Sequence, residues 1–329
     1  MRRRLAKLGI PALLIAGVFY FLQQHYQIDG LSSLRSLTLK PRVSGDASVE
    51  IGLPSGATGD AIRIASFNIQ VFGESKLEKP AIVELLAEIV RSFDVVAIQE
   101  VRAQSQDLLP RFLDAVNAKG AHYHYVLGPR LGRTSSKEQY AFIYNMATVE
   151  LDRESVYTVH DPDDLLHREP LVAGFRVRGP PVEEAFTFTL INIHTDPDEV
   201  AVEIEALDDV FRAVRDDGRY EDDLILLGDF NADDVRLRAA GGLGSVTAAI
   251  SGQPTNTRGT DTYDNLLFQP LTTSEFTGRA GVVDLLRAFN LTMERALEIS
   301  DHCPVWAEFS IREGGRGGRV AARDAAPAR

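Results

Sequence analysis

The segment DLILLGDFN, residues 223–231, decides how the chain must fold. Four large aliphatic side chains follow one another and then give way to Asp229 and Asn231. A continuous apolar run of this length predicts a strand that is buried on both faces. An Asx turn would explain the two polar residues. However, a charge at the end of a buried strand is unfavourable unless it is paired, so the segment also predicts a polar site at this strand end.

Similar apolar runs alternate with helical patterns along the rest of the chain. Pro80 opens a helical pattern at residues 79–93, a second covers 106–118, and a third begins at Pro197 and ends at Gly218. We therefore predict a layered α/β (α+β) domain of stacked sheets with helices outside. The other expected strands cover residues 61–69, 94–101, 140–145, 171–177, 186–194, 263–268 and 303–311.

Several of these strands end in side chains that protein cores avoid. Each one alone has a simpler explanation, such as a turn or a cap, but together they indicate strand ends that converge on one cleft. Besides Asp229 and Asn231, they are Asn68, Glu100, His194, Asp264, Asp301 and His302.

The chemistry of this set is specific. Carboxylates and amides without cysteine ligands suit a hard divalent cation, namely Mg²⁺, with Mn²⁺ or Ca²⁺ as alternatives. Two histidines with nearby carboxylates suit acid and base catalysis near neutral pH. Such a set would hydrolyse a phosphate ester. The chain contains no G-x-S-x-G nucleophile motif, and GGLG at residues 241–244 lacks the Lys-Ser/Thr of a P-loop.

Composition limits the class of protein. The 329 residues are 44% hydrophobic and 25% charged, which fits a globular domain with a large core. The formal net charge of −12 argues against nucleic-acid binding by bulk electrostatics, although a local metal-loaded cleft is compatible with it. Cys303 is the single cysteine, so no internal disulfide can form, and its place before Pro304 suggests packing.

The N-terminus carries an export pattern. Arg2, Arg3, Arg4 and Lys7 precede an uncharged run at residues 8–22. We favour an uncleaved anchor that faces outward from the cytoplasmic membrane, with a cleaved signal and a secreted or periplasmic product as the alternative. The expected organisation is an anchor or signal at residues 1–26, a linker at 27–60, a catalytic domain at 61–312 and a disordered tail at 313–329.

The motifs SFNI, DVVAIQEV, INIH, GDFNAD and SDHCPV, in this order, resemble those of the endonuclease/exonuclease/phosphatase superfamily. RIASFNIQVFGESK, YHYVLGPRLGRTSSKEQYAFIY, REPLVAGF and ALEISDHCPV are similar to stretches of its DNase I branch. The resemblance runs from about residue 62 to residue 311. It implies a four-layer sandwich of two mixed β-sheets flanked by helices, with the cleft at one edge of the sheets.

The resemblance also implies roles for individual residues. Two histidine–carboxylate couples are expected, and sequence does not say which histidine is the base; we favour His194. The implied roles are metal binding by Asn68, Glu100 and Asp301, catalysis by His194 with Glu138 and His302 with Asp264, phosphate and metal binding by Asp229 and Asn231, and substrate contact by Arg102, Arg168 and Tyr263.

Three positions depart from the pattern. Ser136 and Gln70 stand where the DNase I branch places a tyrosine and an arginine in the minor groove, which puts tight duplex binding in doubt. Asp196 stands where a small uncharged residue is usual, as a helix cap or as an extra charge near the metal.

The expected function is that of a divalent-metal-dependent phosphodiesterase, a DNase I-like endonuclease with DNA as substrate. The expected state is a monomer, with no protein partner that can be inferred. A phosphoesterase acting on lipid head groups is the alternative within enzymes, and a non-catalytic binding module is the third possibility. A complete set of catalytic residues disfavours that last possibility.

Overall fold

A computed structural model of the protein describes residues 26–29, 38–41, 48–54, 59–133, 137–239 and 246–314. Two compact units are present, at residues 1–47 and 48–329. In the first unit, β1 (Tyr26–Asp29) and β2 (Thr38–Pro41) pair antiparallel. Residues 1–25 of the predicted anchor and 315–329 of the predicted tail lie outside the described residues. Among the helices that are described, none is long and apolar enough to cross a membrane.

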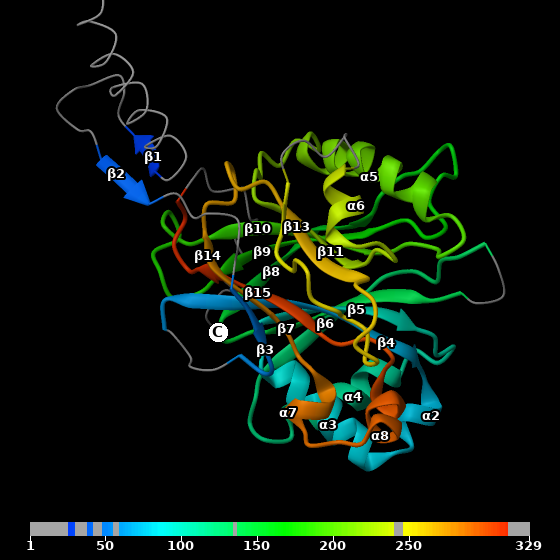
Figure 1. The fold of residues 1–329 in the computed structure, drawn as a ribbon. Helices are drawn as coiled ribbons and strands as arrows, with labels where there is room; N and C mark the ends of the chain where they lie inside the picture. Colours follow the sequence, from blue (N-terminus) through cyan, green and yellow to red (C-terminus); the bar gives the residue numbers. More distant parts are fainter. Residues whose placement is uncertain are drawn as a thin grey trace, which may run out of the picture. The chain divides into compact units, whose positions relative to one another are not determined.

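The second unit contains two mixed sheets that lie face to face with helices outside them (Figure 1). In spatial order, the six-stranded sheet consists of β12 (Thr247–Ala248), β13 (Asp264–Phe268), β11 (Leu224–Asp229), β10 (Thr187–His194), β9 (Leu171–Val177) and β8 (Val149–Thr158). The seven-stranded sheet consists of β3 (Ser48–Ile51), β14 (Phe276–Val282), β15 (Val305–Ser310), β4 (Ala61–Phe72), β5 (Val95–Val101), β7 (Gln139–Asn145) and β6 (Tyr123–Leu127).

The helices form the two outer layers. The helices α5 (Val200–Arg215) and α6 (Asp234–Ala239) lie on the six-stranded sheet. The helices on the other side are α2 (Glu74–Leu77), α3 (Pro80–Arg91), α4 (Leu108–Asn117), α7 (Leu285–Ala288) and α8 (Met293–Ile299). This is the four-layer sandwich that the sequence predicted, and the fold class is confirmed.

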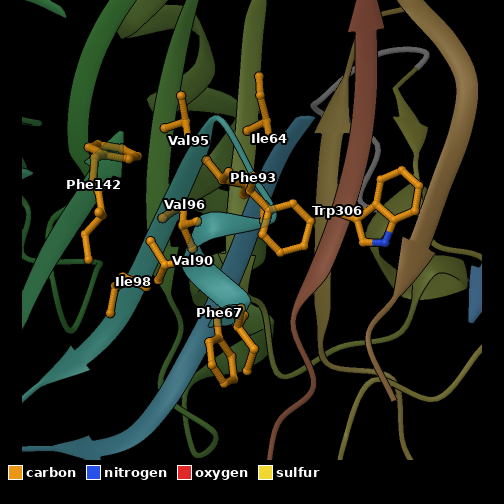
Figure 2. Packing of buried hydrophobic residues seen from close by; sticks show 14 of the residues in the cluster. Ile64, Phe67, Val90, Phe93, Val95, Val96, Ile98, Phe142 and Trp306 are labelled. Carbon is orange, nitrogen blue, oxygen red and sulfur yellow. The ribbon is translucent and has the colours of Figure 1, made fainter. Parts of the chain in front are cut away.

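Side chains alternate between the two faces of the six-stranded sheet, so its buried residues fall into two hydrophobic clusters. In β10 and β11, Ile191 and Leu226 pack under α5, whereas the neighbouring Leu190 and Leu227 point into the space between the sheets. Burying both faces explains why DLILLGDFN is apolar without interruption. On the seven-stranded sheet, Val90 of α3 and Phe93, which follows the helix, pack among strand residues such as Val95 (Figure 2).

Aromatic rings fill most of the space between the sheets. Phe142 of β7 meets Phe175 of β9 edge to face, with ring centroids 5.9 Å apart. Phe309 of β15 meets Phe268 of β13 in the same way at 5.6 Å. These ring contacts hold the two sheets together.

A polar layer interrupts these aromatic contacts close to the strand ends. Gln99 of β5 donates to the side chain of Asn192 in β10 at 2.7 Å, and Ser66 of β4 accepts from Gln99 at 3.1 Å. Asn192 also donates to the backbone carbonyl oxygens of Ile98 at 3.2 Å and Ala141 at 3.1 Å. The polar layer therefore joins the two sheets by directional bonds within one or two residues of Asn68, Glu100 and His194.

The boundaries of the domain differ from the sequence prediction at both ends. β3 lies within the range expected as a linker, because Ser48–Ile51 pairs in parallel with β14 and extends the seven-stranded sheet. At the other end, the backbone N–H of Glu313 donates to the Glu184 carbonyl at 2.9 Å, so ordered structure continues past residue 312. Cys303 is buried, and burial raises the pKa of its thiol to about 12, in line with a packing role.

Candidate active site

The polar strand ends meet at one end of the sandwich. β10 and β11 run parallel, and His194 pairs in register with Asp229. Asp229 in turn lies opposite Asp264 at the start of the antiparallel β13. Asn68 and Glu100 come from the parallel strands β4 and β5 of the other sheet, and the Asn68 amide donates to Asp229 at 3.0 Å. The structure thus brings residues from both sheets to one point.

Two histidines face each other across Asp229. His194 Nδ1 lies 2.7 Å from Glu138 Oε1, and His302 Nδ1 lies 2.9 Å from Asp264 Oδ2. The Nε2 atom of each histidine lies 3.5 Å from the same oxygen, Asp229 Oδ2. Each ring is therefore held through Nδ1 by its own carboxylate, and both Nε2 atoms point to a common centre.

The carboxylates control the charge of these rings. Burial lowers the pKa of His302, but Asp264 and Asp229 outweigh burial and raise the pKa to about 10. Burial likewise lowers the pKa of His194, and Glu138 and Asp229 outweigh it, so the net direction is also upward. The two carboxylates therefore favour the charged form of His302.

Glu138 is buried among positive groups. Burial raises the pKa of its carboxyl group, but His194, Arg168 and Arg102 together reverse that effect and lower it. Arg168 Nε lies 3.2 Å from Glu138 Oε1, and Arg102 Nη2 lies 3.6 Å from Glu138 Oε2. Arg168 also donates to the carbonyl oxygen of His194 at 3.1 Å. Arg168 is only 4% exposed, so it holds the histidine couple in place and presents little surface to a substrate.

Asn68, Glu100 and Asp301 are the residues at which a metal was predicted. The Asn68 amide donates to Glu100 Oε1 at 3.2 Å, which leaves Asn68 Oδ1 buried and without a partner. Asp301 accepts from Gln70 at 2.9 Å through Oδ2, and its Oδ1, which lies 3.9 Å from His302 Nε2, has no hydrogen-bond partner. Unpartnered oxygens next to a carboxylate fit a hard divalent cation.

The remaining predicted residues border this centre. The backbone of Asn231 donates to Asp229 Oδ1 at 3.0 Å, and its side chain donates to the Thr195 carbonyl at 2.9 Å. The Tyr263 ring lies 5.8 Å from the His302 ring. Arg102 bridges Glu100, at 3.0 Å, and Glu138. Ser136 lies outside the described residues, so the minor-groove departure is described only at Gln70.

Asp196 has a local structural role. Its Oδ1 accepts from the backbone of Asp198 at 2.9 Å, and its Oδ2 lies 3.4 Å from His167 Nδ1. Glu203 of α5 accepts from the backbone N–H groups of both Asp196, at 3.1 Å, and His167, at 3.3 Å. Asp196 thus forms an Asx turn before α5, whose N-cap is Glu199 without a side-chain capping bond, so Asp196 is not the cap of this helix.

Two residues at the site were missed by sequence reasoning. The Tyr140 hydroxyl accepts from the backbone of His194 at 2.8 Å and is buried under the histidine. Lys76 is buried and donates to the carbonyl oxygen of Ile299, two residues before Asp301. Burial lowers the pKa of Lys76 to about 8, although Asp301 and Glu100 oppose the shift. Both residues lie in segments that the motifs cover, but no local pattern shows that their side chains turn inward.

Comparison with known proteins agrees with this geometry. The model of the Endonuclease/Exonuclease/phosphatase family matches residues 65–290, more than half of the chain. The chain belongs to this family. Asp301 and His302 lie beyond the matched range, so their place in the site rests on the structure.

Individual members of the family match most of the chain. Rat deoxyribonuclease gamma is 31% identical over 272 residues, covering 77% of this chain and 85% of the relative. Bovine deoxyribonuclease-1 is 33% identical over 268 residues, covering 75% and 92%. A family member of known structure from Bacteroides thetaiotaomicron superposes with a TM-score of 0.54 at 19% identity, covering 76% of this chain and 98% of that one. The last likeness concerns the fold alone.

Proposed function

We propose that this chain is a divalent-metal-dependent endonuclease that hydrolyses the phosphodiester bonds of DNA. The observation that carries the proposal is the pair of histidine–carboxylate couples whose Nε2 atoms lie 3.5 Å from the same oxygen of Asp229. Relatives named deoxyribonucleases, at 31% to 34% identity over about three quarters of the chain, support DNA as the substrate class.

The two couples divide the proton transfers. Glu138 accepts from Nδ1 of His194, which leaves Nε2 free to take a proton from the attacking water when the ring is neutral. Asp264 accepts from Nδ1 of His302, whose pKa is raised to about 10, so that Nε2 carries a proton for the leaving oxygen. Asp229 orients both rings toward the scissile phosphate.

We propose Asn68, Glu100 and Asp301 as the residues that hold Mg²⁺. A divalent cation bound there supplies positive charge to the phosphoryl oxygens. Asn68 and Asp301 each offer a buried oxygen without a partner. Arg102 and Tyr263, at the border of the site, are proposed to contact the substrate.

A plasmid-nicking assay tests the function. We expect the full-length chain to nick supercoiled DNA with Mg²⁺, and excess EDTA to abolish the activity. His302→Ala should lower the rate by about 10²- to 10⁴-fold because the leaving oxygen loses its proton donor. Near-full activity of that variant, or equal activity in EDTA, would refute the scheme. Hydrolysis of lipid head groups without nicking would replace DNA by a lipid substrate.

We also propose that the domain is exported and held outside the cytoplasmic membrane by the N-terminal segment. The basic residues before the apolar run at 8–22 support this. Fractionation of cells followed by N-terminal sequencing distinguishes the anchored form, which keeps residue 1, from a processed one.

A further inference from the structure

Gln70 contacts one of the two carboxylates that are proposed to bind Mg²⁺. Its Nε2 atom donates to Asp301 Oδ2 at 2.9 Å, which joins β4 to the turn between α8 and β15. An ionised carboxylate can only accept a hydrogen bond, so the amide nitrogen is the end of the glutamine that faces it. The polar end of this half-buried side chain is therefore turned toward Asp301.

The backbone around Asp301 is fixed without any help from Gln70. Thr257 donates its backbone N–H to the carbonyl oxygen of Asp301 at 2.7 Å and its hydroxyl to that of Ser300 at 2.7 Å. The hydroxyl of Ser300 donates to the carbonyl oxygen of Asn68 at 2.7 Å and accepts from the backbone N–H of His302 at 3.0 Å. With its backbone held on both sides, Asp301 keeps freedom only in its side-chain torsions.

The side chain of Asp301 has few other contacts that could orient it. It is 44% exposed, so packing does not select one rotamer. Among the residues that the structure describes, Gln70 alone donates a hydrogen bond to this carboxylate. His302 Nε2 lies 3.9 Å from Oδ1, which is beyond hydrogen-bond distance. Because Gln70 occupies Oδ2, Oδ1 is the oxygen that remains for a cation.

The backbone next to Gln70 is strained. β4 loses its regular pairing with β5 between Asn68 and Phe72, and Val71 inside this break has a φ of 51°. A β-branched residue is unfavourable in this left-handed region and persists only where the surrounding structure requires it. Val71 also donates its backbone N–H to Glu100 Oε2 at 2.8 Å. Two consecutive residues of β4 thus donate to both carboxylates of the proposed metal site.

We propose that Gln70 is a positioning residue, which orients Asp301 for the divalent cation and makes no contact with the substrate. The role rests on the metal site of the proposed function. A hydrogen bond from an outer residue sets the orientation of a metal ligand, and its loss typically lowers metal affinity by about 10- to 100-fold. A neutral amide also leaves the full negative charge of Asp301 to the cation, whereas a basic side chain in its place would repel the cation.

Binding of Mn²⁺ in the absence of DNA tests this role. Gln70→Met keeps the length of the side chain and removes its donor. The Kd of the full-length chain for Mn²⁺ should therefore rise by about 10- to 100-fold, as measured by electron paramagnetic resonance of the free ion. Gln70→Ala removes the same donor and should give a similar rise. Gln253→Met, the same change at another half-buried glutamine, should keep the Kd within about twofold. A wild-type Kd in both Gln70 variants would overturn the role.

Nicking kinetics separate positioning from substrate contact. In Gln70→Met, the Mg²⁺ concentration that gives half of the maximal rate should rise by about tenfold or more, while KM for supercoiled DNA at saturating Mg²⁺ stays within about twofold of wild type. A residue that contacts DNA would instead raise KM and leave the Mg²⁺ requirement unchanged, and that result would overturn the proposal. A Tm within about 2 °C of the wild type shows that the variant is folded.

Glu100→Gln distinguishes an error about Gln70 from an error about the metal site. It removes a proposed ligand, so it should raise the Kd for Mn²⁺ at least as much as Gln70→Met does. A rise in Glu100→Gln alone would refute the role of Gln70 and keep the metal site. An unchanged Kd in both variants would refute the metal site and the role of Gln70 with it. If both variants weaken Mn²⁺ binding but the wild-type chain does not nick DNA, the role of Gln70 holds and the proposed function fails.

Discussion

Both ends of β11 carry a buried aspartate, and the two are surrounded in opposite ways. Asp229 lies between two histidines and accepts from an asparagine amide. Two arginines lie close to Glu138, the carboxylate that holds one of these histidines. Asp223 lies among other carboxylates, with no ion pair within the described chain. The strand between them is the same uninterrupted apolar run. The difference teaches that burial of a carboxylate alone does not identify a catalytic residue; the groups that neutralise it do.

The largest expected difference between the two aspartates appears when each is neutralised in turn. Asp229→Asn should lower the nicking rate by about 10²- to 10⁴-fold, because both histidines lose the negative charge that their Nε2 atoms face. Asp223→Asn should leave the rate near that of the wild type, because it lies at the far end of the strand. Steady-state nicking with Mg²⁺ measures both, with circular dichroism to verify folding. A comparable loss in both variants would contradict the division of roles.

The acid side of the pH–rate profile tests whether His194 is the general base. Glu138 raises the pKa of His194, so wild-type kcat/KM should rise with pH through a value above 6.5 as His194 loses its proton. Glu138→Gln removes that stabilisation of the charged ring, so the acid limb should move to lower pH. The maximum rate should fall roughly 10²-fold because the ring is held less firmly. An acid limb that stays in place would mean that His194 is not the base.

The polar layer is the next test, because it lies directly beside the histidine end. Asn192→Leu leaves Gln99 and two backbone carbonyl oxygens without their donor or acceptor. The free energy of unfolding should fall by about 1–3 kcal/mol, as measured by urea titration. The matched change of Leu190→Met, two residues earlier on the same strand face, should cost less than about 1.5 kcal/mol.

The smallest expected effect concerns an exposed ion pair. Glu184 pairs with Arg312, and both side chains are more than half exposed. Glu184→Gln should change the free energy of unfolding by no more than about 0.5 kcal/mol, because such pairs are solvated and screened. A loss above about 2 kcal/mol would contradict this expectation.

The sequence predicted which residues meet at the histidine end of the sandwich, because the signal there is local. Each of Asn68, Glu100, His194 and Asp229 ends an apolar run, so a polar residue out of place was visible without any knowledge of the fold. The buried carboxylates Glu221, Asp223 and Glu275 have no such signal. Glu275 stands in a loop, where charges are ordinary, and only the folded arrangement of the two sheets brings it close to Asp223.

Strands with irregular burial were also missed. β8 alternates only in part, because a register shift between Asp152 and Tyr157 breaks its period of two. β14 carries Gly278 and Gly281 and is buried only toward its end, so it lacks the continuous apolar run that marked β11. β3 is four residues long and is defined by its partner rather than by its own sequence.

The polar layer has a consequence for how the chain finds its native state. The hydrophobic effect between the sheets is not directional, so it selects one alignment less sharply than hydrogen bonds do. Only one alignment pairs Gln99 with Asn192, and any other leaves buried amides unsatisfied. The same alignment is the one that places His194 beside Glu138. A chain that folds into the wrong alignment is thus both less stable and inactive, so selection for activity also guards against misfolded products.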